Sequence, residues 1–267
     1  MADAASSFKA QFGEDKLLAQ HFADKPAGYF VEIGAYDGVR MSNTFYFEQI
    51  GWHGLLVEAD PDLAQRCREA RPHSAVVQCA VVAPDAPKTV TFQVSEDWKS
   101  LSSLSFDRAR KEQLERLSGG FRVSSIAVPG KTLDEILDDN AVATIDFLTI
   151  DVEGHEWDVL RGFSIDRWRP EIVIVERNTL LPDLRIARYM FEHGYRYIRT
   201  TGVNDWFGRA QRDVASRVRD VSHFATTFYV VHPAQVGVRR ARKRLKAAAR
   251  ATLARVGLLE TVKRFRR

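Results

Sequence analysis

A chain of 267 residues with 45% hydrophobic side chains can bury a full core, as one large domain or a domain with appendages. The formal charge of the chain is +4, and residues 239–267 account for it with twelve Lys or Arg and one acid. The remaining residues, 1–238, carry −7. The composition therefore gives no support for a catalytic face that binds nucleic acid. No apolar run reaches membrane-span length, and residues 1–9 lack a signal-peptide core, so a cytoplasmic protein is expected. The two cysteines, Cys67 and Cys79, have no metal-ligand spacing and are expected in the core.

The first predicted elements are a helix over residues 8–22 and a buried strand that begins at residue 29. Gly34 opens a turn after this strand, and Asp37-Gly38 closes it. Both glycines can adopt positive φ, which would let a ligand lie close to the backbone at the carboxyl end of the strand. Glu32 and Asp37 add carboxylates that suit a cationic amino group. This pattern favours an amino-acid-like ligand over a pyrophosphate, because the Gly-x-Gly-x-x-Gly fingerprint is absent.

The second strand points to an adenosine ligand. A helix is predicted from residues 42–44 up to Gly51, and the strand over residues 54–58 follows. This strand ends in Glu58, and Pro61 is well placed as the first residue of the next helix. Glu58 lies 24 residues after Gly34. In nucleotide-binding folds an acid at this place accepts hydrogen bonds from the ribose hydroxyls.

Strands and helices alternate through the remaining chain, which predicts an α/β sheet with right-handed crossovers. The predicted strands are residues 75–82, 89–94, 124–128, 145–150, 172–175, 195–199 and 226–231, with the last two as an antiparallel edge pair. The predicted helices are residues 107–117, 132–137, a segment containing residues 157–163, and 184–193. A long Ser-rich connection over residues 98–105 is of the kind that often carries function.

Four carboxylates follow four predicted parallel strands: Glu32, Glu58, Asp151 and Glu176. Ligands of open α/β sheets gather at the carboxyl ends of the strands. Like charges collected in one cleft cost free energy unless a ligand, a metal or a catalytic task compensates them. A functional site is therefore expected at this edge.

Four motifs, in order, resemble the FkbM family of S-adenosylmethionine-dependent methyltransferases. They are Phe-Val-Glu-Ile-Gly-Ala-Tyr-Asp-Gly with Ser-Asn-Thr (residues 30–44), Val-Glu-Ala-Asp-Pro (57–61), Thr-Leu-Asp (132–134) and Ile-Asp-Val-Glu-Gly-His-Glu (150–156). The paired first and last motifs are specific, and the match extends from about residue 28 to 229. This chain has Tyr36 where the family's usual first motif has Asn.

The resemblance implies a class I methyltransferase, Rossmann-like fold with a seven-stranded, mostly parallel sheet, an antiparallel edge pair and helices on both faces. It implies transfer of a methyl group from S-adenosylmethionine, mostly to a hydroxyl of a sugar or secondary metabolite. The domain would span residues 28–235, between an N-terminal helical segment (1–27) and a basic helical tail (236–267). By resemblance, the methionine part would contact Glu32, Gly34, Asp37, Gly38 and Asn43, the ribose would contact Glu58 with Ala59, and the adenine would contact Gln78 and Ala80.

Methyl transfer to an alcohol calls for a general base or a metal that lowers the pKa of the hydroxyl. The candidates are Asp151, which also borders the cofactor, with Glu153, His155 and Glu176; His155 or Glu153 is favoured as the base. A second interpretation is a magnesium site on Asp151 and Glu176, with Asn178 as a further ligand. The residues before the predicted last strand, 204–207, are expected in a loop that lines the acceptor pocket or covers the core edge.

The alternatives fall into different classes. An NAD-dependent oxidoreductase lacks support because the third glycine of its fingerprint is missing, and a base-amino methyltransferase would need a polar-Pro-Pro-aromatic motif. The tail over residues 239–267 could be a solvated extension, could lie on an anionic membrane near a lipid-linked glycan, or could contact nucleic acid. A catalytically silent fold that tethers a partner through this tail also remains open. The leading prediction is an O-methyltransferase acting on a glycan or glycolipid precursor.

Overall fold

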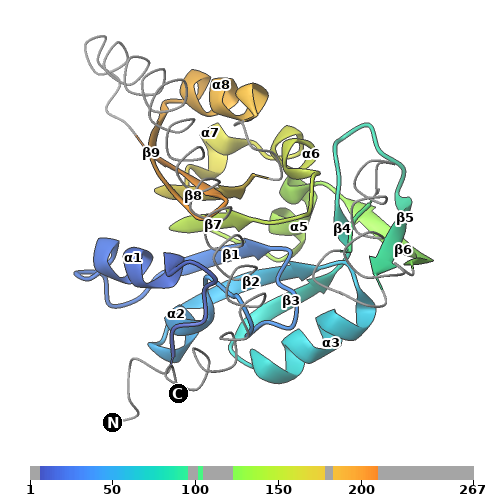
Figure 1. Ribbon diagram of the computed structural model, residues 1–267, viewed down its shortest axis with the longest axis horizontal. Coiled ribbons are helices and arrows are strands. Elements are labelled where there is room, and N and C mark those ends of the chain that lie inside the picture. The colour runs from blue at the N-terminus through green and yellow to red at the C-terminus, as the bar shows by residue number, and fades with distance from the viewer. Residues whose placement is uncertain (1–6, 96–101, 105–122, 178–182, 210–267) are drawn as a thin grey trace, which may run out of the picture. The chain divides into compact units, whose positions relative to one another are not determined.

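The computed structural model describes residues 7–95, 102–104, 123–177 and 183–209 (Figure 1). The strands are β1 Tyr29–Ile33, β2 His53–Glu58, β3 Ser74–Gln78, β4 Ala80–Val81, β5 Thr89–Ser95, β6 Val123–Lys131, β7 Phe147–Ile150, β8 Ile172–Glu176, β9 Tyr195–Thr201 and β10 Asn204–Arg209. The helices are α1 Glu14–His21, α2 Phe45–Gln49, α3 Pro61–Ala70, α5 Leu133–Asp139, α6 Glu156–Arg161, α7 Ile165–Trp168 and α8 Leu184–Glu192. Helices and strands alternate along most of this path, as the sequence predicted.

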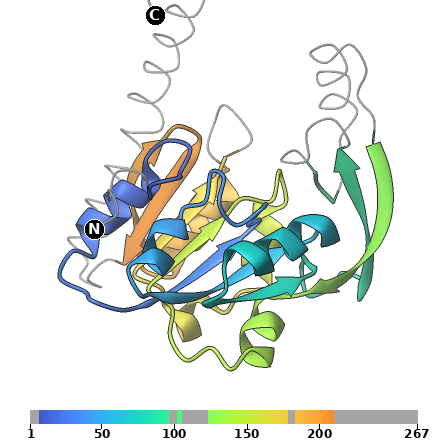
Figure 2. The same cartoon turned by 90° about the horizontal axis from the view of Figure 1, so that it is seen from below.

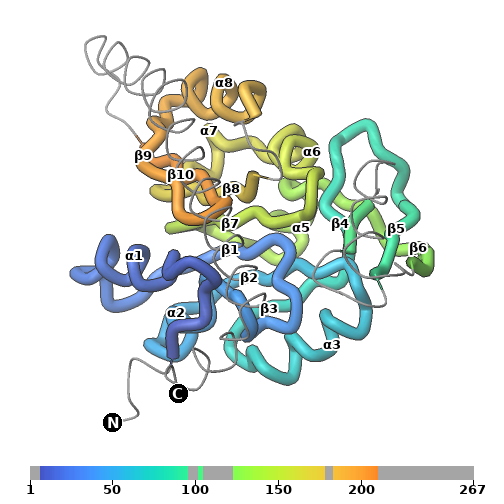
Figure 3. Tube along the Cα trace, viewed as in Figure 1, coloured from blue at the N-terminus to red at the C-terminus, as the bar shows by residue number. Residues whose placement is uncertain are grey.

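Seven strands form the main sheet in the order β3-β2-β1-β7-β8-β10-β9 (Figures 1 and 3). The first five are mutually parallel, and β10 runs antiparallel to both β8 and β9. This order and the single reversed strand confirm the predicted class I methyltransferase fold. The carboxyl ends of β1, β2 and β7 lie side by side, since Ile33 pairs with both Val57 and Ile150.

The prediction for the edge of the sheet was wrong in one place. Residues 204–207, expected in a loop, are the start of β10, whose first five residues are all buried. Gly202 adopts φ +56 in the tight connection from β9, so the two strands follow each other directly. The polar pair Asn204-Asp205 suggested a loop, but both side chains are buried. The predicted strand over residues 226–231 lies outside the described residues, as do the predicted helix over 107–117 and the tail over 239–267.

Side chains alternate across the main sheet and bury both faces. Phe30, Phe147 and Ile174 join one hydrophobic cluster with α1 and α2, in which the Phe47 and Phe147 rings lie 4.8 Å apart. Their sequence neighbours Val31, Leu148 and Val173 are equally buried and therefore face the other layer of helices. Figure 2 shows helices on both sides of the sheet.

The N-terminal helix is shorter than predicted. It begins at Glu14 rather than at residue 8, because two buried acids bind backbone N–H groups of the preceding residues and hold them in a bent segment outside the helix. Asp15 accepts hydrogen bonds from the backbone N–H groups of Lys9 (2.6 Å) and Ala10 (2.9 Å), and Glu14 accepts one from Phe12 (2.9 Å).

In the described parts of the chain, no helix combines the length and apolar character needed to cross a bilayer.

A second sheet of three strands, in the order β4-β6-β5, stands beside the main one. β5 and β6 were predicted as separate strands, with β6 shorter than observed. β4 was predicted wrongly as the end of one strand over residues 75–82 that also included β3, and nothing in the pattern indicated a second sheet. Ser103 forms a bridge with Gln93 of β5, which attaches residues 102–104 to this sheet. The small sheet thereby reaches the edge of the main sheet at which the strand-end acids lie.

Candidate active site

A pocket of the described chain lies at the carboxyl ends of β1, β2 and β7. We call it the main cavity; the space between its walls that no atom fills is about 920 Å³, with the open mouth included. Its lining includes eight of the predicted site residues: Glu32, Gly34, Asn43, Glu58, Ala59, Ala80, Asp151 and Glu153. Five others are not part of its lining: Asp37, Gly38, Gln78, His155 and Glu176.

Gly34 sets the floor of the main cavity. It adopts φ +81, and a Cβ on it would lie 1.7 Å from the backbone oxygen of Asp151. The backbone N–H of Gly34 also donates to Val57 O (2.9 Å). The glycine therefore allows the ends of β1, β2 and β7 to approach one another, in addition to the predicted role of admitting a ligand.

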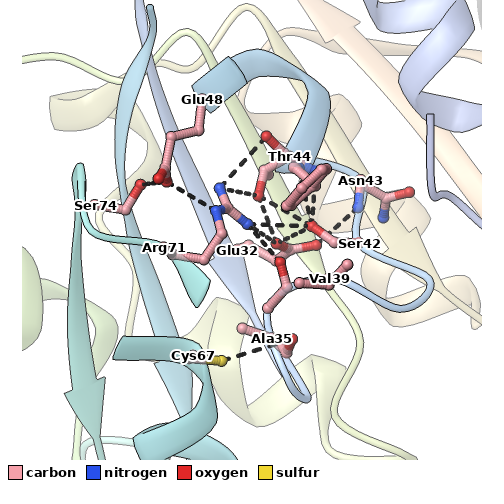
Figure 4. A network of polar contacts seen from close by, with 12 residues as sticks. Glu32, Ala35, Val39, Ser42, Asn43, Thr44, Glu48, Cys67, Arg71 and Ser74 are labelled. Carbon is pink, nitrogen blue, oxygen red and sulfur yellow. Dashed lines mark hydrogen bonds and ion pairs between the residues drawn. The ribbon is translucent and has the colours of Figure 1, made fainter. Parts of the chain in front are cut away.

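Glu32 is buried beside the cavity, and its oxygens are already used by the chain (Figure 4). It accepts hydrogen bonds from Ser42 Oγ (2.9 Å), Asn43 N (2.9 Å) and Thr44 Oγ1 (2.6 Å). Burial raises the pKa of Glu32, while Arg71 and these hydrogen bonds act in the opposite direction. Glu32 thus shapes the turn over residues 42–44, where sequence reasoning had assigned it a direct contact with the amino group of a ligand.

The predicted contacts of Asp37 and Gly38 with a ligand are not supported by the geometry. Asp37 accepts from the N–H groups of Val39 (3.1 Å) and Arg40 (2.8 Å), so it stabilises its own turn. A Cβ on Gly38 would meet Arg71 and Cys67, which makes this glycine a packing requirement of α3. Both residues support the wall of the cavity from behind.

Glu58 occupies the predicted place at the tip of β2. It is buried and accepts hydrogen bonds from Tyr36 N (2.8 Å) and Asp60 N (2.9 Å). Burial raises the pKa of Glu58 to about 7, against the effect of these hydrogen bonds. Gln78, expected at the adenine edge, instead donates to Ala59 O (2.8 Å) and fixes the backbone beside Glu58. Cys79 and Ala80 line the cavity in its place.

Three carboxylates meet beyond β7 and β8: Asp151, Glu153 and Glu176. One oxygen from each lies within 4.8 Å of the others. Asp151 is open to solvent on the side of the cavity and enclosed by protein on the other sides. The pKa of Asp151 is raised well above its usual value, chiefly because this enclosure disfavours the charged form. The negative charge of Glu176 and a hydrogen bond with Glu176 raise it further. Among the described residues, Glu176 Oε2 is buried without a hydrogen-bond partner. The cluster therefore brings three carboxylates close together, and their mutual repulsion contributes to the raised pKa of Asp151.

His155, one of the two favoured bases, lies apart from the main cavity. Its Nδ1 is 3.0 Å from Asp158 Oδ2, and it lines a separate pocket with Asp85 and Arg161. The cause is local: Glu153 and Gly154 both adopt positive φ, and α6 begins directly after His155. This turn leaves Glu153 at the cavity and carries His155 away from it. Of the two favoured candidates, Glu153 lines the main cavity and His155 does not.

Sequence reasoning missed two groups of residues. Phe92 of β5 and Leu104 line the main cavity from the small sheet, and Ser103 Oγ donates to Glu153 O (3.1 Å). The Ser-rich connection was the signal for this side of the cavity. The other group, Arg71 and Glu48, lies behind the opposite part of the lining, residues 40–43, and no motif indicated it. Asn178, expected as a metal ligand, lies outside the described residues.

Left-handed backbone at residues other than glycine is concentrated around the main cavity. Of the five such residues among those described, Tyr36 (φ 54), Met41 (φ 61) and Glu153 (φ 54) line it. Strain of this kind persists only where the surrounding structure enforces it and is frequent at functional sites. The loops of the cavity are therefore held in shape by their surroundings.

Replacing Tyr36 with Asn is expected to stabilise the protein by about 0.5–1 kcal/mol, because Asn tolerates the left-handed region better than Tyr does. The change removes the contact of the ring with the Arg40 guanidinium, 5.1 Å from its centroid, an exposed interaction of small value. Urea denaturation measures the free energy of unfolding. Tyr36→Phe keeps both ring and strain and should leave this free energy nearly unchanged; a loss of stability in Tyr36→Asn would contradict the explanation.

Comparison with protein families shows where the chain belongs. The family described as "Methyltransferase FkbM domain" matches residues 32–197, which is more than half of the chain. The chain belongs to this family. The match confirms the resemblance seen in the motifs, and with it a methyltransferase dependent on S-adenosylmethionine. The FkbM domain includes the main cavity from Glu32 to Glu153 and the end of β8 at Glu176.

Solved structures similar to this FkbM protein share the fold at low identity. A TehB-like methyltransferase from Corynebacterium glutamicum is 11% identical, with 77% of this chain and 91% of that chain covered (TM-score 0.40). An O-methyltransferase from Bacillus cereus is 14% identical, with 76% and 83% covered (TM-score 0.40). A precorrin-6y C5,15-methyltransferase from Geobacter metallireducens is 10% identical, with 74% and 87% covered (TM-score 0.42). No curated protein matches the sequence.

Proposed function

We propose that this FkbM protein is an O-methyltransferase that moves the methyl group of S-adenosylmethionine to a hydroxyl of a sugar, glycan or glycolipid precursor. The carboxylate cluster of Asp151, Glu153 and Glu176 beside the main cavity is the observation that carries the proposal. A positive sulfonium compensates its charge, and a carboxylate can take the proton that an alcohol releases. The acceptor class rests on the resemblance to the family.

The cofactor would extend along the ends of β1 and β2. Its methionine part would lie over Gly34 and beside Asn43, its ribose hydroxyls would donate to Glu58, and its adenine would lie against Ala59 and Ala80, all of which line the cavity. These assignments follow the predicted ones, without Asp37, Gly38 and Gln78, and with Glu32 acting through the turn over residues 42–44 instead of by direct contact. They place the methyl group near Asp151, whose backbone touches Gly34.

Glu153 is the base in this proposal. Transfer is an in-line displacement in which the acceptor oxygen forms a bond to the methyl carbon, the carbon–sulfur bond breaks, and the sulfonium becomes a neutral thioether. The proton of the hydroxyl passes to the Glu153 carboxylate, which the turn over residues 153–154 presents to the cavity. Asp151 offsets the positive charge of the sulfonium. The gain in rate comes from alignment and from a base in reach of the hydroxyl.

A magnesium ion is the second way to compensate the cluster. Carboxylate oxygens suit this ion, and the unpartnered Glu176 Oε2 among the described residues fits the need for a further positive group. Asp151 and Glu176 would hold it, with Glu153 as the third carboxylate. When bound, the ion would lower the pKa of an acceptor hydroxyl. Titration with Mg²⁺ of the wild type and Asp151→Asn, followed by calorimetry, tests this second proposal directly.

Affinity for S-adenosylmethionine is expected to rise with pH between about 6 and 8. The pKa of Glu58 is about 7 in the free protein, and the ribose hydroxyls favour the ionised carboxylate, so binding releases a proton below that pH. One pH unit below the pKa, affinity should be about tenfold lower than its plateau. Calorimetric titration at pH 6, 7 and 8 measures this.

Glu58→Gln is the matched control, since it keeps the shape of the side chain and removes its titration. It should bind the cofactor more weakly and with a smaller pH dependence in this window; what remains would come from Asp151, which lines the same cavity and whose pKa is also raised. Glu156, whose pKa burial also raises to about 7, does not line the main cavity and is expected to contribute nothing to the effect. A wild type whose affinity is equal at all three pH values would refute the ribose assignment.

The reaction itself is tested with labelled methyl groups. Purified protein, labelled S-adenosylmethionine and a panel of monosaccharides, sugar nucleotides and lipid-linked sugars are incubated, and products are separated by mass. Incorporation at a hydroxyl supports the proposal; incorporation only at amino groups or carbons would overturn it. The lipid-linked acceptor and a membrane contact through residues 239–267 stay predictions, because that segment lies outside the described residues.

A further inference from the structure

Arg71 is a fully buried cation directly behind the wall of the main cavity. It follows the last residue of α3, and its side chain is 0% exposed. Its guanidinium donates to Glu48 Oε2 (2.8 Å), Gly38 O (2.9 Å), Thr44 Oγ1 (3.1 Å), Ser42 Oγ (3.4 Å) and Thr44 O (3.4 Å). Arg71 itself does not line the cavity. It acts only through the groups that it holds.

The groups held by Arg71 are the two ends of one loop (Figure 4). Gly38 is at one end, and Ser42 and Thr44 are at the other. Between them lie Arg40 and Met41, which with Ser42 and Asn43 form part of the cavity wall. A single planar guanidinium therefore links the two ends of a loop whose middle is attached elsewhere by one β-bridge, between Met41 and Ala10. Its fixed fork of donors suits this task, and a lysine ammonium cannot reproduce it.

Arg71 shares its positive charge between two carboxylates, one of them at the cavity. Glu48, also 0% exposed, forms the close ion pair with Arg71 and accepts further hydrogen bonds from Ser74 Oγ and His73 N. Glu32 is farther away, with its Oε2 at 3.9 Å from Arg71 Nη1. One cation thus faces two carboxylates, and the less compensated one is the residue at the cavity. Removing Arg71 would leave both carboxylates buried without their cation.

A buried ion pair is weak support for stability, because desolvation of the charges offsets much of their attraction. The same number of apolar atoms would fill the space behind the wall. What the guanidinium adds is a fixed position for the loop over residues 38–44 and for Glu32. Both belong to the region where the methionine part of the cofactor is placed above.

We propose that Arg71, with Glu48 as its anchor, is a positioning residue for the cofactor: it holds the loop over residues 38–44 and Glu32 in the form that binds the methionine part of S-adenosylmethionine. The proposal rests on the proposed function for the identity of the ligand. The position of the loop is independent of that identity and is measured separately.

Two measurements on Arg71→Gln and Arg71→Lys test the proposal. Circular dichroism first identifies a temperature at which each variant is folded. Calorimetry at that temperature then gives the dissociation constant for S-adenosylmethionine. This constant should be at least tenfold higher than wild type in Arg71→Gln and at least fivefold higher in Arg71→Lys. Brief trypsin treatment without ligand reports on the loop through the exposed Arg40, whose side chain is 61% exposed. The peptide that ends at Arg40, quantified by mass spectrometry, should appear at least fivefold faster in both variants.

Asp134→Ala is the control for general loss of stability. Asp134 accepts hydrogen bonds from Trp168 Nε1 (2.7 Å) and Ser164 N (2.9 Å) and does not line the main cavity. It should lower the melting temperature and leave both the dissociation constant and the cleavage at Arg40 within twofold of wild type. Equal effects of Asp134→Ala and Arg71→Gln would overturn the proposal, as would Arg71 variants that match wild type in both measurements. A further outcome separates the two proposals. If wild type does not bind S-adenosylmethionine and the Arg71 variants are still cleaved faster at Arg40, the role of Arg71 in the loop is supported and the proposed function is contradicted.

Discussion

Glu153→Gln is expected to lower methyl transfer by about 10²–10⁴-fold while affinity for S-adenosylmethionine stays within about threefold of wild type. The amide keeps the size of the carboxylate and loses its capacity to take a proton. Glu153 lines the main cavity, and its backbone is held in place by Ser103 Oγ, so the turn should survive the change. The measurement is incorporation of labelled methyl on the hydroxyl acceptor found with wild type, with cofactor binding measured in parallel.

His155→Ala is the matched comparison, two residues farther along the same loop. His155 pairs with Asp158 and faces a separate pocket, so its removal should leave transfer within about threefold of wild type. The two variants separate the bases that sequence reasoning favoured equally. Normal transfer in Glu153→Gln together with a large loss in His155→Ala would reverse the assignment.

The placement of the site was predictable because it depends on local patterns. Buried strands that end in Gly34, Glu58 and Asp151 were identified from short apolar runs, and parallel strands bring their carboxyl ends to one edge. Three of the four strand-end acids, Glu32, Glu58 and Asp151, line one cavity, as expected. The structure adds the register, which was not predicted and which places Ile33 beside Val57 and Ile150.

The direction of individual side chains was not predictable. Gln78 was predicted inside a strand and His155 in the loop after another strand, yet Gln78 turns toward Ala59 and His155 toward Asp158. Each direction depends on a partner or a backbone turn that no periodic pattern encodes. Arg71 and Glu48 are a stronger case, because 23 residues separate the two halves of a fully buried ion pair. In the sequence each reads as an ordinary charged residue on a helix surface.

Gly34→Ala is expected to destabilise the protein by more than about 4 kcal/mol and to prevent recovery of folded protein at 37 °C. The added Cβ would lie 1.7 Å from Asp151 O, which is backbone and cannot turn aside, and the residue has φ +81. Relief requires the ends of β1 and β7 to separate, and with them the hydrogen bond from Asp151 N to Ile33 O (3.0 Å). Urea denaturation followed by circular dichroism gives the free energy of unfolding.

Gly51→Ala isolates the backbone part of this cost. Gly51 has φ +95, yet no atom lies within 4 Å of a Cβ built on it, so only the left-handed conformation is penalised, by about 1–2 kcal/mol. The difference between the two variants measures the close approach of the strand ends. Similar losses of unfolding free energy in Gly34→Ala and Gly51→Ala would mean that the ends of β1 and β7 can separate freely. Gly34 would then not fix the position of Asp151 at the main cavity. A large difference would show that one missing methyl group fixes the distance between the first strand and the carboxylate cluster.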